Sequence, residues 1–145
     1  MTVFEWLLDT IPHVTICREG GIPYLTRWYL LGQDRENRKW PVNLYLHCFH
    51  SSDESIPHNH PWRFAISLIL KGRYLEFRNG VCRVFRAGNI NFIRRDDYHY
   101  VKLGKPVWTL FLAGPRVGRW GFKPETGYED FESYIARKPG AKGTR

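Results

Sequence analysis

Cysteine is scarce in this sequence, and no apolar run is long. The three cysteines, Cys17, Cys48 and Cys82, are odd in number and form no CxxC pair, so neither a disulfide framework nor a zinc ribbon is expected. The longest apolar stretch, residues 65–70, is broken by one serine and is far too short to cross a membrane. The N-terminal segment carries acids and lacks the basic start of a signal peptide. We therefore expect a cytoplasmic protein without membrane association.

Acidic residues are also in the minority. The 22 Lys and Arg against 14 Asp and Glu give a net charge of +8. Clustered basic residues bind nucleic acid through its phosphates, but here they are spread over residues 35–39, 94–95 and 137–145. We therefore expect no nucleic-acid partner. A positive field at the mouth of a pocket would instead concentrate a small anionic substrate.

The length of the chain favours one domain. Its 145 residues are enough for a single hydrophobic core, and an aromatic content of 16% suits strands or an aromatic-lined pocket. We predict a single domain over residues 1–136 and a basic, mobile tail over residues 137–145. Short helices are expected near both ends, at residues 3–8, where Thr2 can cap the first turn, and at residues 129–136.

Short strand-like segments separated by turn residues fill the rest of the sequence. The pair Asn79-Gly80 is typical of a two-residue hairpin. This pattern predicts an all-β protein, an antiparallel sandwich or barrel. The predicted strands are residues 25–31, 42–50, 64–70, 74–78, 81–86, 90–93, 98–103 and 107–112.

Three histidines are the most informative residues. His58 and His60 are two residues apart, so in an extended strand they share one face. His99 lies far along the sequence, where a later strand can bring it to the same place. Three imidazoles can close on one divalent metal and leave coordination positions open, which is typical of a catalytic site. The alternative for an isolated pair of this kind is two surface or capping histidines.

Two glycines lie at spacings from these histidines that resemble the motifs of a known protein family. Gly72 closes the strand-like segment after His60, and Gly88 opens the segment that ends on His99. Together they resemble the two motifs of the cupin superfamily, in which HxH is followed by Glu and Gly, and a later Gly by a third His. Ala65 stands at the glutamate position, and the second motif lacks its proline, glycine and asparagine. The resemblance implies a single cupin-type, jelly-roll-like antiparallel β-barrel and a three-histidine site similar to that of the thiol dioxygenases.

A closer resemblance is to small uncharacterised bacterial and phage cupins with an H-D-H-P-W-type motif. It spans residues 42–128 and implies a fold and a metal rather than a substrate. The segments that carry it are Leu46-His47-Cys48-Phe49, His58-Asn59-His60-Pro61-Trp62, Tyr74-Leu75-Glu76, Trp108-Thr109-Leu110, Gly114-Pro115 and Trp120-Gly121-Phe122.

Other polar residues are candidates for a catalytic role. Tyr45 and His47 share one face of a predicted strand, so either can act as an acid, a base or an orienting residue if that face lines the pocket. A hydrogen-bonded structural histidine is the alternative for His47. Glu76 is a further candidate acid or base. A carboxylate ligand is not expected unless Asp53 or Asp97 swings into the site.

The pocket itself is less well defined by the sequence. Arg27, Arg63 and Arg116 could each hold an acidic substrate, but the sequence does not say which of them faces inward. Ordinary core packing is the interpretation for the aromatic residues Trp62, Trp108, Trp120 and Phe122.

These features favour a mononuclear non-haem Fe(II) oxygenase or dioxygenase. Neutral imidazoles leave the metal its full charge, and open positions would let substrate and oxygen bind side by side. An isomerase, lyase or hydrolase that uses Zn, Mn or Ni as a Lewis acid is the alternative, and a non-catalytic cupin that binds a small ligand is another. We expect a small anionic or aromatic substrate, and the resemblance implies a homodimer formed through an edge strand.

Overall fold

The computed structural model describes residues 2–32, 41–123, 127–130 and 132–134. The basic tail predicted at residues 137–145 lies outside these ranges, as does the end of the helix predicted at residues 129–136.

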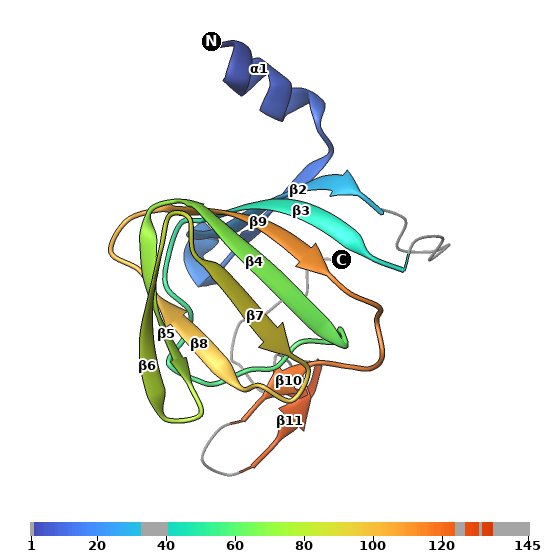
Figure 1. The fold of residues 1–145 in the computed structure, drawn as a ribbon, viewed down its shortest axis with the longest axis vertical. Coiled ribbons are helices and arrows are strands. Elements are labelled where there is room, and N and C mark those ends of the chain that lie inside the picture. Colours follow the sequence, from blue (N-terminus) through green and yellow to red (C-terminus); the bar gives the residue numbers. More distant parts are fainter. Residues whose placement is uncertain (1, 33–40, 124–126, 131, 135–145) are drawn as a thin grey trace.

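The described chain is built mainly of short strands, preceded by one helix (Figure 1). Thr2 caps this helix, and a capping box joins the Thr2 and Glu5 side chains to each other's backbone amides, as the sequence predicted. A short 3-10 turn spans Glu19–Gly21. The elements are α1 (Val3–Thr10), β1 (His13–Cys17), β2 (Pro23–Leu31), β3 (Asn43–Phe49), β4 (Phe64–Lys71), β5 (Arg73–Arg78), β6 (Val81–Arg86), β7 (Ile90–Arg94), β8 (His99–Lys102), β9 (Val107–Ala113), β10 (Gly121–Phe122) and β11 (Glu129–Asp130).

Two antiparallel sheets enclose the interior of a barrel (Figure 1). The larger sheet has the strand order β1-β2-β3-β9-β4-β7, and the smaller has the order β6-β5-β8. Strands β10 and β11 form a separate antiparallel pair. The predicted all-β antiparallel barrel with short helices is therefore confirmed.

The buried side chains of the barrel form three layers. Along β4, Ala65, Ser67 and Ile69 all point inward, and alternate residues of β9 are buried in the same way. The first core cluster consists of Tyr45, Ala65, Ile93, Phe111 and Ala113. The second core cluster consists of Ile69, Tyr74, Val101 and Val107. Between them on β3, β4, β7 and β9 lies a polar layer of four buried residues, His47, Ser67, Asn91 and Thr109.

The structure corrects two predictions. The helix predicted at residues 129–136 was wrong at its start, because Glu129–Asp130 forms β11 and helical backbone is described only at residues 132–134. The Asp130 carboxylate accepts hydrogen bonds from the backbone amides of Glu132 and Ser133, so it caps the turn that follows instead of lying within it. Strand β1 was not predicted, because four of its five residues are exposed and it shows no alternation.

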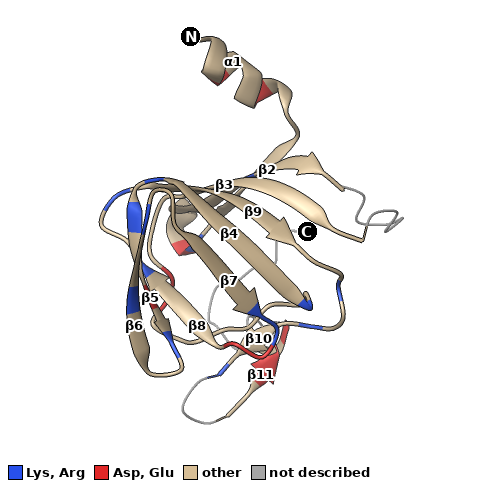
Figure 2. Cartoon of the chain, viewed as in Figure 1, with Lys and Arg blue, Asp and Glu red and all other residues tan. Residues whose placement is uncertain are grey.

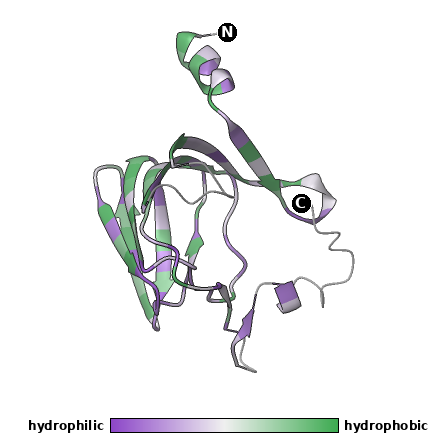
Figure 3. Cartoon of the chain, turned by 90° about the vertical axis from the view of Figure 1, so that its right-hand side faces the viewer, coloured by the Kyte–Doolittle hydropathy of each residue, from purple (hydrophilic) through white to green (hydrophobic). Residues whose placement is uncertain are grey.

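Helix α1 extends away from the barrel (Figure 3). It exposes four apolar side chains, Val3, Phe4, Trp6 and Leu7, and the Phe4 ring reaches Trp108 of β9 at a centroid distance of 6.2 Å. Among the described residues, no helix is both long enough and apolar enough to cross a membrane. The described Lys and Arg residues are spread over the barrel and its loops (Figure 2).

The two motif glycines offer a test of the barrel's turns. Gly72 and Gly88 both have φ of 89°, but a Cβ atom on Gly72 would lie 2.9 Å from the Pro106 carbonyl oxygen, whereas a Cβ atom on Gly88 meets nothing within 4 Å. Gly88→Ala should therefore cost only the left-handed strain of about 1–2 kcal/mol. Gly72→Ala should cost a further 1–3 kcal/mol, roughly, because the backbone must move. Urea unfolding of both variants measures the difference, and equal destabilisation would show that the contact with Pro106 is absent.

Candidate metal centre

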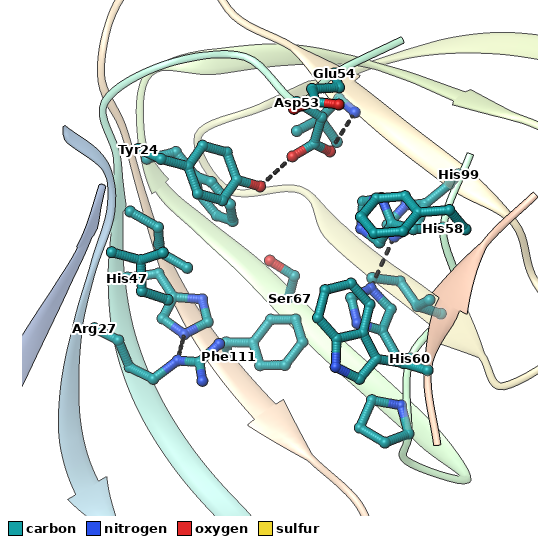
Figure 4. A pocket seen from close by; sticks show the side chains of 18 of the residues that line it. Tyr24, Arg27, His47, Asp53, Glu54, His58, His60, Ser67, His99 and Phe111 are labelled. Carbon is teal, nitrogen blue, oxygen red and sulfur yellow. Dashed lines mark hydrogen bonds between the residues drawn. The ribbon is translucent and has the colours of Figure 1, made fainter. Parts of the chain in front are cut away.

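A pocket of about 440 Å³ opens into the barrel interior (Figure 4). This volume is in the range of small-molecule sites. Residues from both main sheets and from β10 line it, together with the segments before β4 and after β9. The pocket contains all three predicted ligand histidines together with His47 and Arg27.

Main-chain hydrogen bonds bring the two histidine segments together. The His58 amide donates to the His99 carbonyl over 2.9 Å, and the His99 amide donates to the His58 carbonyl over 3.0 Å. Between the first two histidines, Asn59 exchanges hydrogen bonds with Gly121, its side-chain oxygen accepting from the Gly121 amide over 2.8 Å. Asn59 therefore anchors the segment to β10, and His58 and His60 are left on the side of the pocket.

The three imidazoles converge as the sequence predicted. The centroids of the rings are 5.0–5.3 Å apart in all three pairs, and one ligand nitrogen from each ring lies within 4.8 Å of the others. The Nε2 atoms of His60 and His99 are 2.8 Å apart (Figure 4). In the part of the chain that the structure describes, no other group of three His, Cys, Asp or Glu residues has this compactness.

A buried carboxylate fixes the orientation of His99. The Nδ1 atom of His99 donates to Glu76 Oε1 over 2.6 Å, so the Nε2 lone pair faces the other two histidines. The same oxygen accepts from Arg78 over 2.7 Å and from the Asn91 amide over 2.9 Å. Burial opposes the charge on Glu76, but His99, Arg78 and Asn91 outweigh that cost, and the pKa of Glu76 falls to about 2. Glu76 is therefore an ionised group that positions a ligand histidine.

Desolvation keeps the other two histidines neutral. It lowers the pKa of His58 to about 4, although the nearby Asp53 charge acts in the opposite direction. It also lowers the pKa of His60 well below its usual range, and the neighbouring His99 lowers it further. A metal ligand must offer a lone pair, so neutral rings are the form that a metal requires.

The two aspartates considered as possible ligands, Asp53 and Asp97, are bonded to other groups. Both oxygens of Asp53 accept hydrogen bonds, one from the Tyr24 hydroxyl and one from the Val101 amide. Asp97 accepts from the Arg94 amide and from the Arg78 side chain. Neither aspartate belongs to the cluster of ligand atoms. Ala65, which stands at the glutamate position of the resembled motif, is buried in the first core cluster, and Ser67 lines the pocket in its place.

The two predicted catalytic residues lie in different surroundings. His47 lies in the pocket wall, whereas Tyr45 packs in the first core cluster beside Ala65 and Phe111. The Arg27 guanidinium lies over the Tyr45 ring, with its carbon 4.8 Å from the ring centre. A catalytic role for either residue stays a prediction. Of the three candidate arginines, Arg27 and Arg116 line the pocket and Arg63 is exposed.

Aromatic side chains surround the histidines, which the sequence interpretation missed. Trp62 stacks on His60 with a centroid distance of 5.5 Å. Trp120 and Phe122 both approach His58, at 6.2 and 6.0 Å. The predicted core packing holds for Trp62, which packs against the first core cluster, but all three of these residues also line the pocket, whereas Trp108 lies outside it and stacks on Trp28. Their only sequence signal was their place in the family-like Trp-Gly-Phe and His-Pro-Trp segments.

Known structures share this fold. No protein-family model matches the sequence, and no curated protein matches it. A cupin-like protein from Thermotoga maritima has a TM-score of 0.56 at 17% identity, over 80% of this chain and 86% of that chain. A predicted oxalate decarboxylase from the same organism has a TM-score of 0.58 at 18% identity, over 74% and 96%. A structure of Fe(II) HppE has a TM-score of 0.58 at 11% identity, over 72% and 57%.

At these identities the similarity shows the fold alone. The chain has the cupin fold, the double-stranded β-helix named for a further neighbour from Klebsiella pneumoniae. The three-histidine cluster lies inside that barrel.

The bond between Glu76 and His99 can be tested by metal affinity. Glu76→Gln should weaken zinc binding by about 10 to 100-fold, the usual effect of losing such an orienting partner. Asp97→Asn is the matched control, because it removes the other carboxylate that pairs with Arg78 and leaves the bond to His99 in place. Competition with a chelating dye measures both affinities. Equal zinc affinity in Glu76→Gln and the parent protein would contradict the assigned role.

Proposed function

We propose that His58, His60 and His99 hold one divalent metal ion and that the protein is a mononuclear non-haem Fe(II) oxygenase acting on a small molecule. The observation that carries this proposal is the convergence of three imidazoles in the wall of the barrel pocket, with their ligand atoms within 4.8 Å. The same pocket has room for a small molecule beside them.

The donor set fits a first-row transition metal. Imidazole nitrogen suits Fe, Zn, Ni and Cu, whereas Mg and Ca prefer oxygen ligands. The hydrogen bond from His99 to Glu76 leaves the Nε2 atom of His99 as a lone-pair donor. A hydrogen bond to the backbone of Ile56 holds the His58 ring. The side chains are therefore oriented before any metal arrives, which supports a resident ion.

Iron is favoured by the charge of the ligands. No carboxylate joins the three imidazoles among the described residues, so a bound Fe(II) would keep its full charge and supply open positions for a substrate and oxygen. Trp62, Trp120 and Phe122 pack around the histidines and partly shield them from solvent. Fe(II) HppE shows that a protein of similar fold carries iron. A Lewis-acid reaction with Zn, Mn or Ni is the alternative use of the same ligands.

Alanine variants test the ligand set. His58→Ala, His60→Ala and His99→Ala should each be purified with little metal, because two remaining imidazoles hold a divalent ion weakly. His47→Ala should keep the metal of the parent protein, since His47 lies in the same pocket but outside the cluster. Metal analysis by mass spectrometry of untagged protein, prepared without chelators, compares the four variants. Full metal content in His60→Ala would exclude the assigned site.

Nitric oxide tests for iron with an open position. The anaerobic Fe(II)-loaded protein should give the high-spin iron–nitrosyl EPR signal, because nitric oxide is a stable stand-in for oxygen, and His60→Ala treated in the same way should not. A protein that is isolated with zinc, and that gives no nitrosyl signal after iron loading, would refute the oxygenase proposal and favour the Lewis-acid alternative.

A further inference from the structure

The pocket contains a second polar pair that the proposed metal site does not use. Arg27 of β2 and His47 of β3 are paired across the larger sheet, and both line the pocket. Arg27 Nε donates a hydrogen bond to His47 Nε2 over 2.9 Å (Figure 4). The His47 ring stacks on Phe111 with a centroid distance of 4.9 Å. Hydrogen bonding and packing therefore hold this pair, called here the Arg27–His47 pair, in a fixed orientation.

The hydrogen bond determines the tautomer of His47. An arginine nitrogen can only donate, so His47 Nε2 must be the acceptor. Burial lowers the pKa of His47 well below its usual range, and the charge of Arg27 lowers it further, so the ring is neutral. A neutral imidazole carries a single N–H, which in this ring must be on Nδ1. Figure 4 shows this second nitrogen on the side of the ring that faces the cavity.

This Nδ1–H is buried without an acceptor. The His47 side chain is 2% exposed, and among the described residues Nδ1 has no hydrogen-bond partner. A buried donor of this kind costs about 1–3 kcal/mol until an acceptor reaches it. Thr109, the register partner of His47 on β9, has a side-chain oxygen that is likewise unpartnered. The polar layer therefore contains one N–H donor, on His47 Nδ1, that no acceptor among the described residues satisfies.

The charges around the pair favour an anionic acceptor. Arg27 brings a positive charge next to the Nδ1–H, and Arg18 and Arg116 line the same pocket. The two acids in the lining, Asp53 and Glu54, accept hydrogen bonds from Tyr24 and Tyr134. An oxygen that carries negative charge would satisfy the donor with a charge-assisted hydrogen bond, which is roughly twice as strong as a neutral one. The positive charges of the lining also attract such an oxygen into the pocket.

The position of Phe111 limits the shape of the ligand. Phe111 lies between the Arg27–His47 pair and the three histidines, and its ring centroid is 4.9 Å from that of His47 and 6.3 Å from that of His60. A molecule that reaches both the Arg27–His47 pair and His60 must pass over this aromatic ring, in a pocket that Phe49, Trp62 and Trp120 also line. An anionic end and a flat or apolar body meet these conditions.

We propose that the Arg27–His47 pair binds the carboxylate of a small substrate, with one oxygen accepting from His47 Nδ1–H and the negative charge beside Arg27. The apolar body of this substrate extends over Phe111 toward the three histidines. Only the orientation toward the histidines rests on the proposed metal function, because the carboxylate site itself requires no metal.

Calorimetric titration with benzoate and benzamide tests the site. The two molecules have nearly the same shape and differ in charge, and they are added both to zinc-loaded protein and to protein stripped with a chelator. Benzoate should bind more tightly than benzamide in both samples. Arg27→Gln should weaken benzoate binding by about 10 to 100-fold, because it removes the positive charge beside the bound carboxylate, and should change benzamide binding little. Arg63→Gln removes the same charge from an exposed position and should change neither.

A second measurement follows the His47 proton directly. Nitrogen-15 NMR of the histidine rings should show His47 protonated on Nδ1, and benzoate should shift this signal in the parent protein. Phenylacetate and phenylacetamide extend the comparison to a longer body. Circular dichroism and zinc content confirm that Arg27→Gln and the milder Arg27→Lys are folded and keep the metal site intact.

The outcomes separate this proposal from the metal proposal. Benzoate binding that requires zinc and is unchanged in Arg27→Gln places the carboxylate on the metal and overturns the Arg27–His47 site. Carboxylates that bind no better than their amides overturn it as well. So does a His47 signal that moves in Thr109→Val but not with benzoate, because Thr109 is then the acceptor. Benzoate binding to a protein that cannot be loaded with any divalent metal would support the carboxylate site while the metal proposal fails.

Discussion

The hydrogen bonds and ion pairs around the buried Glu76 carboxylate are the interactions on which the geometry of this site depends. An isolated carboxylate inside a protein is costly, so Glu76 is tolerable only with every partner in place. Those partners come from different strands: Arg78 from β5 itself, Asn91 from β7 and His99 from β8. Since β7 belongs to the larger sheet and β5 to the smaller, the same cluster joins the two sheets at one side of the barrel. The position of a ligand histidine and the closure of the fold are thus set by one group.

The parts of the site that could be predicted from the sequence are those whose residues have a recognisable spacing over a short stretch of chain. His58 and His60 are recognisable because residues two apart share a face, and His99 because it ends a glycine-led segment. The barrel follows from short strands and the Asn79-Gly80 hairpin, which the structure places between β5 and β6.

Other parts depend on contacts that no local pattern records. The carboxylate that orients His99 is 23 residues away in sequence, on a strand that pairs with β8. Its partner Asn91 looks like any polar strand residue until β7 brings it into the interior. The aromatic rings around the histidines have the composition of core residues, and only the tertiary structure shows that they border a cavity. The wrong start of the helix predicted at residues 129–136 has the same cause, because the pairing of β11 with β10 outweighs local helix preference at residues 129–130.

The layered interior has a consequence for how such a barrel can change over evolutionary time. Its stability rests on two packed apolar clusters, while most of the residues that face the cavity lie outside both clusters, many of them on the loop that carries His58 and His60 and two, His47 and Ser67, in the polar layer. Exchanging a side chain in that middle layer changes neither the pairing of the strands nor the packing within the two apolar clusters. A lineage can therefore try new ligands or new substrates at little cost in folding, which is one physical reason why a single barrel architecture can serve many unrelated reactions.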